Sequence, residues 1–206
     1  MNEKFFDLKK EKQDRMINAA LKIFAENGFR RASTDEMVKE AGISKGLLFH
    51  YFISKTGLYQ FVFDYSVKYL VMEMTSSVNK QETDYFQICR QIEKAKLGTM
   101  KNFPYMQLFL LRAECEEAPE ALEAVREPAE ALLEAYDTIL KRVDFSGVCG
   151  IASERLAKIV DYTLNGLLAE MVREPEFDPK LYYKEALRYL EDMEKLCAET
   201  AQVGNA

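Results

Sequence analysis

The chain has 206 residues, of which 48% are apolar and 30% are charged, a composition that predicts a folded globular protein rather than a disordered one. No apolar run approaches the roughly 20 residues needed to span a bilayer, and the opening segment, MNEKFFDLKKEKQDR, is too charged for a signal peptide. We therefore expect a cytoplasmic protein with no membrane partner.

The charges are distributed unevenly along the chain. Residues 1–57 contain 11 Lys or Arg against 8 Asp or Glu, a net charge of +3, whereas residues 58–206 contain 17 against 26, a net charge of −9. A basic end on an acidic chain is typical of a protein whose polyanion binding is confined to that end. Chance asymmetry of solvated surfaces is the alternative interpretation.

The cysteines give no sign of a metal or disulfide site. Cys89, Cys115, Cys149 and Cys197 lie far apart and form no Cys-x-x-Cys pair, and the chain has a single histidine. We interpret all four cysteines as small core residues. We expect no metal site and no cofactor.

Apolar residues three and four apart recur through a chain with only 5 prolines and 9 glycines, which predicts an all-α fold. The first helix should cover residues 8–27 and end at Gly28, where a left-handed residue closes a helix at little cost. Ser33 followed by Glu36 fits a capping box that opens a second helix, and Gly42 should end it.

Two further serines predict the next helix starts. Ser44 should cap a short third helix ending near Phe52, and Ser54 a long fourth helix from Lys55 to about Val78. Five more helices follow, and Pro128 should kink or split the third of these. They are predicted at residues 84–102, 104–116, 119–142, 152–173 and 179–200, with loops at 144–150 and 174–179.

The second and third helices, joined by the turn AGIS, have the spacing of a helix-turn-helix. If Leu48 and Phe52 point into the core, the helical period turns a different face of the third helix outward. That outer face carries Gly46, Leu47, Phe49 and His50. Such a face suits docking into the major groove of DNA.

Two lysines strengthen this interpretation. Lys45 and Lys55 lie at predicted helix starts, where the helix dipole disfavours a cation by roughly 0.3–1 kcal/mol. A phosphate bound there by backbone N–H groups and lysine would reverse the penalty, and such contacts commonly fix a protein on duplex DNA. Two ordinary solvated lysines are the alternative.

The run GFRRASTDEMVKEAGISKGLLFHYFISKTGLY, residues 28–59, resembles the N-terminal DNA-binding domain of the tetracycline-repressor (TetR) family of bacterial transcription regulators. The resemblance covers residues 8–60 in detail and the rest only in length and helicity. It implies an all-α fold of about nine helices, with a three-helix helix-turn-helix domain at residues 1–54 and a larger effector-binding and dimerisation domain at residues 55–206.

The resemblance also implies roles for individual residues. Thr34 and Lys45 align with residues that touch DNA in the family, Lys45 often at a base edge. Phe49, Tyr51 and Lys55 align with residues that typically meet phosphates. The predicted DNA-binding set is Ser33, Thr34, Ser44, Lys45, Gly46, Leu47, Phe49, His50, Tyr51 and Lys55.

Three residues depart from the family pattern. Leu47 replaces a common threonine, Phe49 replaces the usual tyrosine, and Asp35 stands where some members have a base-contacting arginine. The first two changes remove hydroxyl contacts, although Leu47 could pack on a thymine methyl group. The operator sequence therefore does not follow from the resemblance.

The last two predicted helices carry apolar stripes, and the first of these stripes is wider than the ~100° of an ordinary surface helix. Pairing with their copies in a two-fold four-helix bundle, as in the family, would bury both stripes. Burial within one protomer is the alternative. The predicted interface residues are Leu156, Ile159, Val160, Thr163, Leu164, Leu167, Leu168, Met171, Leu187, Leu190 and Met193.

The helices between residues 55 and 142 are rich in aromatic residues and methionine, a pattern that on its own is more often plain core. In the family the same helices surround an effector pocket, and adaptable methionines with aromatic walls suit an apolar or amphipathic ligand. The predicted pocket residues are Tyr65, Tyr69, Met72, Phe86, Cys89, Met100, Phe103, Met106, Phe109 and Tyr136.

Together these inferences predict a ligand-responsive regulator, most simply a repressor that binds a partly palindromic DNA operator as a homodimer and is released by a small effector. An activator would use the same DNA-binding domain, and a helical protein-binding adaptor without operator binding is a second alternative. An enzyme is disfavoured because nucleophile–base pairs are scarce with one histidine. Carboxylates such as Glu114, Glu116 and Glu117 are more simply a solvated face.

Overall fold

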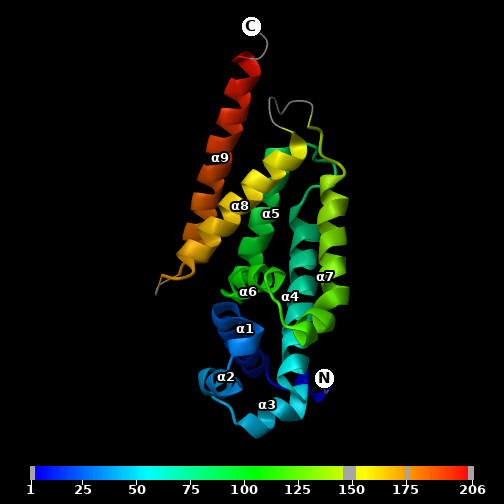
Figure 1. The fold of residues 1–206 in the computed structure, drawn as a ribbon, viewed down its shortest axis with the longest axis vertical. Helices are drawn as coiled ribbons and strands as arrows, with labels where there is room; N and C mark the ends of the chain where they lie inside the picture. Colours follow the sequence, from blue (N-terminus) through cyan, green and yellow to red (C-terminus); the bar gives the residue numbers. More distant parts are fainter. Residues whose placement is uncertain (1–2, 146–151, 175–176, 204–206) are drawn as a thin grey trace. The chain divides into compact units, whose positions relative to one another are not determined.

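The computed structural model of the protein describes residues 3–145, 152–174 and 177–203. These residues form helices and turns with one isolated β-bridge, between Asp84 and Asp144, which agrees with the all-α prediction (Figure 1). The elements are η1 Glu3–Phe5, α1 Lys10–Arg31, α2 Thr34–Ala41, α3 Lys45–Phe52, α4 Lys55–Ser77, α5 Tyr85–Met100, α6 Met106–Glu114, α7 Pro119–Leu140, α8 Ser153–Met171 and α9 Pro179–Val203.

The chain packs into two compact units. The first unit contains Met1–Met72 and Thr99–Glu134, and the second contains Glu73–Gly98 and Ala135–Ala206. The predicted functional boundary after residue 54 falls inside the first unit. Among the described residues, no helix combines the length and apolarity that crossing a membrane requires.

Most predicted helix ends are confirmed. Gly28 has φ +69° and interrupts α1, after which one more turn runs to Arg31. Gly42 has φ +65° and closes α2, because glycine adopts this left-handed conformation without the steric cost of a Cβ. Pro128 does not split α7, which is continuous from Pro119 to Leu140.

An aromatic cluster joins α1, α4 and α6 in the core of the first unit. The ring of Phe24 contacts those of Phe29, Tyr59 and Phe109, with centroids 6.3, 4.9 and 6.0 Å away, and all four side chains are buried. Burial raises the pKa of the Tyr59 hydroxyl, as expected for a phenol removed from water. This cluster fixes α1 to the start of α4 and to α6.

The short helix η1 was not predicted. Its Phe5 side chain is completely buried, with ring centroids 5.1 Å from Phe52, 5.2 Å from Phe61 and 5.7 Å from Tyr51. The N-terminal segment therefore covers the inner side of α3. The charged composition around Phe5 hid this contact from a search for helical periodicity.

In the second unit, α8 packs on α9. Leu156, Val160, Leu164 and Leu168 form the inner stripe of α8, each at most 4% exposed, and Leu190 of α9 is fully buried. The same core contains a polar contact between α5 and α9, in which the Tyr182 hydroxyl donates to Glu93 Oε2 at 2.8 Å.

The cysteine prediction is only partly correct. Cys89 and Cys197 are buried, and burial raises the pKa of the Cys89 thiol to about 12. Cys115 is exposed in the segment that follows α6, so its interpretation as a core residue is wrong. Cys149 lies outside the described residues.

Candidate nucleic-acid interface

Helices α2 and α3 and the turn between them form the predicted helix-turn-helix. Ser33 Oγ accepts the N–H of Glu36 at 3.5 Å, and Ser44 Oγ accepts the N–H of Leu47 at 3.2 Å. Both hydroxyls thus satisfy backbone groups that a helix start leaves without an internal partner. The caps and the left-handed Gly42 fix the angle between the two helices.

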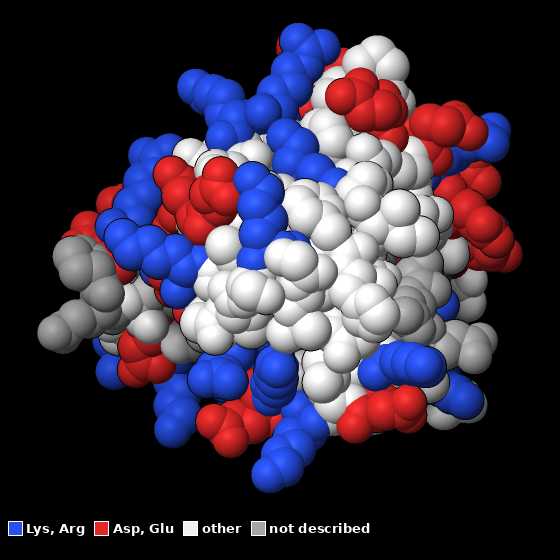
Figure 2. Space-filling view, turned by 90° about the horizontal axis from the view of Figure 1, so that it is seen from below, with Lys and Arg blue, Asp and Glu red and all other residues white. Residues whose placement is uncertain are grey.

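The two faces of α3 are those predicted. Leu48 and Phe52 are 3% and 1% exposed and pack inward, whereas Lys45, Gly46 and His50 are exposed. Leu47 and Phe49 are half-buried at the sides, and Thr34 at the start of α2 is half-buried as well. Figure 2 shows this end of the molecule from below, where Lys and Arg side chains, with Asp and Glu side chains among them, surround an uncharged central surface. This pattern suits contact with phosphates around a groove.

Tyr51 occupies a different place from the other predicted contact residues. Its side chain is 7% exposed, and its ring lies edge-on to Phe5 and to His50, with centroids 5.7 and 5.0 Å away. The ring therefore belongs to the core beneath α3. The phosphate contact predicted for Tyr51 stays a prediction. Only the small exposed part of the side chain could make it.

The Lys55 ammonium is held by the end of α1. Its Nζ donates to the carbonyl oxygens of Phe29, Arg30 and Ala32 at 2.9, 3.3 and 3.4 Å, and lies 4.6 Å from the centre of the Phe29 ring. A cation is stabilised at a helix C-terminus by the unpaired carbonyls and the helix dipole. Lys55 thus ties α1 to α4, a role that the sequence did not indicate.

Lys45 forms an ion pair across the turn. Its Nζ lies 2.9 Å from Asp35 Oδ1, and both side chains are more than half exposed. The sequence did not indicate this pairing, and the DNA contact predicted for Lys45 stays a prediction. Asp35 is one of the three departures from the family pattern, and its position on α2 places a carboxylate beside the start of α3.

Sequence reasoning also missed Glu116. It was expected on a solvated face but is half-buried, and its Oε2 accepts the N–H of Phe29 at 2.8 Å. Its Oε1 accepts the N–H groups of Glu117 and Ala118, both at 3.0 Å, just before α7. The carboxylate therefore links the end of α1 to the α6–α7 connection. An acidic residue before a helix start was the available signal.

Replacing Glu116 by Gln should lower the free energy of unfolding at pH 7 by about 1–2 kcal/mol, because a neutral amide oxygen accepts these bonds more weakly. Partial burial opposes ionisation, but the N–H donors and the charge of Arg30 outweigh it and lower the pKa of Glu116. Because the pKa of Glu116 is lower in the folded state than in the unfolded state, the ionised carboxylate stabilises the protein at pH values above the unfolded-state pKa. This contribution is lost as the pH falls through the folded-state pKa.

Urea denaturation at pH 7 and at about pH 3, below the ordinary glutamate pKa, checks this prediction. The difference between wild type and Glu116→Gln should shrink at the lower pH. Glu117→Gln is the matched control, because only the backbone of Glu117 takes part in the contact. An equal loss in both variants would contradict the prediction.

The ten predicted effector-pocket residues are divided between the two units. Phe86, Cys89 and half-buried Tyr136 belong to the second unit, and Met100, Met106 and Phe109 are buried core of the first. The remaining four line an open groove of about 740 Å³ in the first unit, here called the aromatic groove. Its lining residues are Phe6, Lys10, Asp14, Phe61, Asp64, Tyr65, Lys68, Tyr69, Met72, Asn102 and Phe103.

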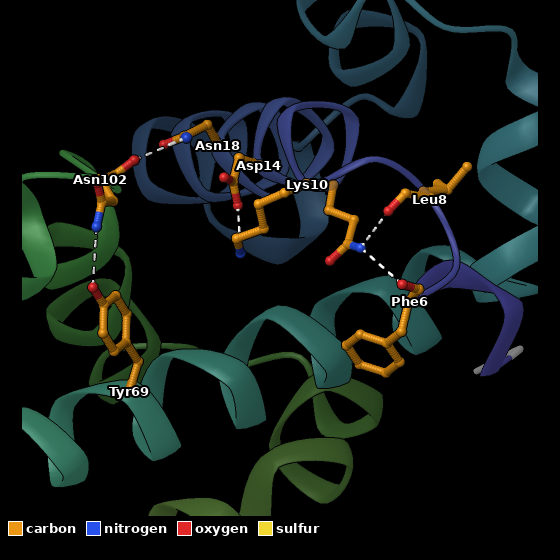
Figure 3. A network of polar contacts seen from close by, with 8 residues as sticks. Phe6, Leu8, Lys10, Asp14, Asn18, Tyr69 and Asn102 are labelled. Atoms are coloured by element: carbon orange, nitrogen blue, oxygen red, sulfur yellow. Dashed lines mark hydrogen bonds and ion pairs between the residues drawn. The ribbon is translucent and has the colours of Figure 1, made fainter.

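Hydrogen bonds beside the aromatic groove connect α1 to α4 through the turn that precedes α6 (Figure 3). The Asn18 amide donates to the Asn102 carbonyl at 3.0 Å, and the Asn102 amide donates to the Tyr69 hydroxyl at 3.1 Å. Asparagine side chains of this kind give no periodic signal in a sequence. Only the fold brings residues 84 positions apart into contact.

The predicted dimer residues divide into two sets. Leu156, Val160, Leu164, Leu168 and Leu190 are buried within the second unit, which is the alternative weighed from the sequence. The others retain a solvent-facing surface: Ile159 is exposed, and Thr163, Leu167, Met171, Leu187 and Met193 are half-buried. Tyr162 and Leu196, which were not predicted, are 70% and 63% exposed on α8 and α9. Among the described residues, no cluster of three or more His, Cys, Asp or Glu could hold a metal.

Residues 16–62 match the family model described as bacterial regulatory proteins, tetR family. The HTH-type transcriptional regulator UidR of Escherichia coli is 52% identical over 46 residues, which are 22% of this chain and 24% of UidR. The chain thus spans about a quarter of the length of this curated relative.

Solved structures extend the likeness to the whole fold. A TetR family regulator from Chloroflexus aurantiacus superposes with a TM-score of 0.67 at 18% identity, covering 96% of both chains. FadR from Bacillus subtilis, solved in complex with stearoyl-CoA, superposes with a TM-score of 0.58 at 16% identity over 85% of this chain and 96% of its own. The family match thus covers the helix-turn-helix segment, and the solved structures show that the chain shares their overall fold.

Proposed function

We propose that the protein is a transcription regulator that binds a partly palindromic DNA operator as a homodimer, and that it acts as a repressor released by a small effector. The observation that supports this most strongly is the capped helix-turn-helix, whose outer α3 face carries exposed Lys45, Gly46 and His50. This face lies within the segment that matches the family model. Residues 1–54 are the proposed DNA-binding domain, and residues 55–206 the proposed effector-binding and dimerisation domain.

The proposed DNA contacts differ in kind. Lys45, at the start of α3, is placed for a phosphate or base edge, and His50 and Leu47 for the groove. Ser33, Thr34 and Ser44 lie at helix starts, where backbone N–H groups bind phosphates. Because Asp35 pairs with Lys45 in the free protein, docking on DNA must exchange this carboxylate for a phosphate.

The test is selection of bound fragments from the source genome by the purified protein, followed by affinity measurements on the enriched site. The affinity should fall steeply as the salt concentration rises, by a factor of about 10³–10⁵ between 50 and 200 mM salt if 6–10 phosphates are contacted. Absence of any enriched partly palindromic site would contradict the proposal. Binding without salt dependence would favour a protein-binding adaptor.

Two variants sharpen this test. Lys45→Met should weaken binding and reduce the salt slope by about 1 per protomer, because one phosphate contact is lost. Asp35→Asn should strengthen binding, because it removes both the competing partner of Lys45 and a charge that repels phosphate. Lys184→Met on α9 is the matched control and should change neither quantity. An Asp35→Asn variant with weaker binding would assign the carboxylate to base recognition instead.

The proposed effector is apolar or amphipathic. FadR of Bacillus subtilis, solved with stearoyl-CoA, supports this class of ligand for a protein of the same fold. The direct probe is the same affinity measurement with stearoyl-CoA present, and weaker operator binding is the expected result. Ligand-driven movement of α4 would change the separation of the two DNA-binding domains in the dimer.

The proposed dimer uses the outward faces of α8 and α9. Ile159, Tyr162, Tyr189 and Leu196 are 40–70% exposed there, and apolar side chains gathered on one helix pair are typical of a contact surface. Two copies related by a two-fold axis would form a four-helix bundle. A dimer also supplies the two DNA-binding domains that a partly palindromic operator requires.

A further inference from the structure

The aromatic groove has the size and composition of a ligand site. Its volume of about 740 Å³ lies within the range of about 300–1,000 Å³ that small-molecule sites occupy. Five aromatic rings line it, and the partly exposed side chain of Met72 stands at its rim. All of its walls come from the first unit.

Three of these rings pack edge to face. The Phe103 ring lies 5.5 Å from Tyr65 at 82° and 5.8 Å from Tyr69 at 86°, measured between centroids and ring planes. All three rings line the groove. The negative face of an aromatic ring attracts a cation.

A cation of the protein already occupies this position. Lys10 Nζ lies 5.9 Å from the ring centres of both Tyr65 and Phe103, and 2.8 Å from Asp14 Oδ1. Figure 3 shows Lys10 and Asp14 side by side on α1, joined by this ion pair. The Asp14 Oδ1 atom itself is buried. A carboxylate and two ring faces therefore converge on one ammonium group.

The charged side chains of the groove differ in how exposed they are and in how freely they can move into solvent. Lys68 pairs with Asp64 at 2.7 Å as Lys10 pairs with Asp14, so the groove is neutral as a whole. The lysine side chains are 65% and 75% exposed and can swing into solvent, whereas Asp14 and Asp64 are 32% and 40% exposed on short side chains. When the lysines move out, the groove keeps its aromatic rings and two carboxylates.

We propose that the aromatic groove binds an amphipathic organic cation, whose charged centre replaces the Lys10 ammonium against Asp14 and the rings of Tyr65 and Phe103. The apolar part of the ligand then covers Phe6, Phe61 and Met72. This binding goes beyond the proposed function, because it depends neither on DNA nor on a dimer.

Calorimetric titration of the full chain with tetraphenylphosphonium and with tetraphenylborate tests the proposal. The two ions match in size and shape but have opposite charge, so shape alone would bind them equally. Tetraphenylphosphonium should bind more tightly by about tenfold or more. Equal affinities, tighter binding of the borate, or binding of neither ion would overturn the proposal.

Two substitutions should change tetraphenylphosphonium binding in opposite directions. Asp14→Asn should weaken it by about tenfold, because a charged partner is lost. Lys10→Met should strengthen it several-fold, because the competing internal ammonium is gone. Glu11→Gln and Lys12→Met, neighbouring residues of α1 outside the groove lining, are the matched controls and should leave it unchanged. Weaker binding to Lys10→Met, or unchanged binding to Asp14→Asn, would overturn the proposal, provided that circular dichroism shows an intact fold.

Discussion

Replacing Glu93 by Gln is expected to lower the free energy of unfolding by about 3–5 kcal/mol, the cost of leaving a buried charge without its partner. The Glu93 side chain is 1% exposed, and its Oε1 lies 2.8 Å from Nζ of Lys96, which is 14% exposed. Burial by itself would lower the pKa of Lys96, but the charge of Glu93 outweighs it and raises that pKa well above the ordinary value. Without Glu93, the lysine would have to lose its proton or become solvated.

The Tyr182 hydroxyl adds to this cost. It donates to Glu93 Oε2 at 2.8 Å, and its pKa is raised by burial and by the neighbouring negative charge. This hydrogen bond joins α5 to α9 in the core of the second unit. The measurement is urea unfolding of wild type and variant, followed by far-ultraviolet circular dichroism.

A double variant separates the charge from the packing. Glu93→Gln with Lys96→Met should recover much of the lost stability, because no buried charge then remains without a partner. Glu185→Gln, which removes one member of the more exposed pair with Arg188 in the same unit, is the surface control and should have only a small effect. If the double variant is as unstable as the sum of the two single ones, the pair is not energetically coupled.

Replacing Tyr162 by Glu should give a folded monomer with operator affinity reduced on the order of 100-fold or more, since the linkage between two half-sites is lost. The side chain is 70% exposed on α8, so the charge costs little within one protomer. In a two-fold dimer the substitution is present once in each protomer, so two carboxylates would be buried in the interface. Burying them there is costly.

Sedimentation equilibrium, thermal unfolding and operator titration check this prediction together. The variant should sediment as a monomer, keep its helix content and lose operator affinity. Leu133→Glu, with a side chain 66% exposed on α7, is the control for adding a charge outside the proposed interface. A Tyr162→Glu protein that stays dimeric would contradict the proposed interface.

Short-range signals in the sequence were sufficient to predict most of the secondary structure. Serine caps at Ser33 and Ser44 and the glycine at Gly42 are confirmed because each acts on groups within a few residues along the chain. The inward direction of Leu48 and Phe52 is confirmed for the same reason, since the helical period alone sets it. The short helix at Phe5 was missed, because a single buried ring has no period to detect.

The contacts of charged residues could not be read in the same way. The sequence showed that Lys45, Lys55 and Glu116 are charged, but not that Asp35, the end of α1 and the N–H of Phe29 are their partners. These pairings span 10 to 87 positions and depend on how the helices cross. The same holds for the Lys10 ammonium over Tyr65, which exists only because α1 and α4 meet.

The sequence by itself determined the helices, the helix-turn-helix and the outward face of α3, because these depend on spacing and on short-range backbone chemistry. Only the tertiary structure decided which stripe of α8 is already buried, which lysines already have partners, and where the first unit leaves a groove. Packing determines which apolar face of a helix is buried, and long side chains form contacts with residues of other helices. Neither choice is contained in the period of a single helix.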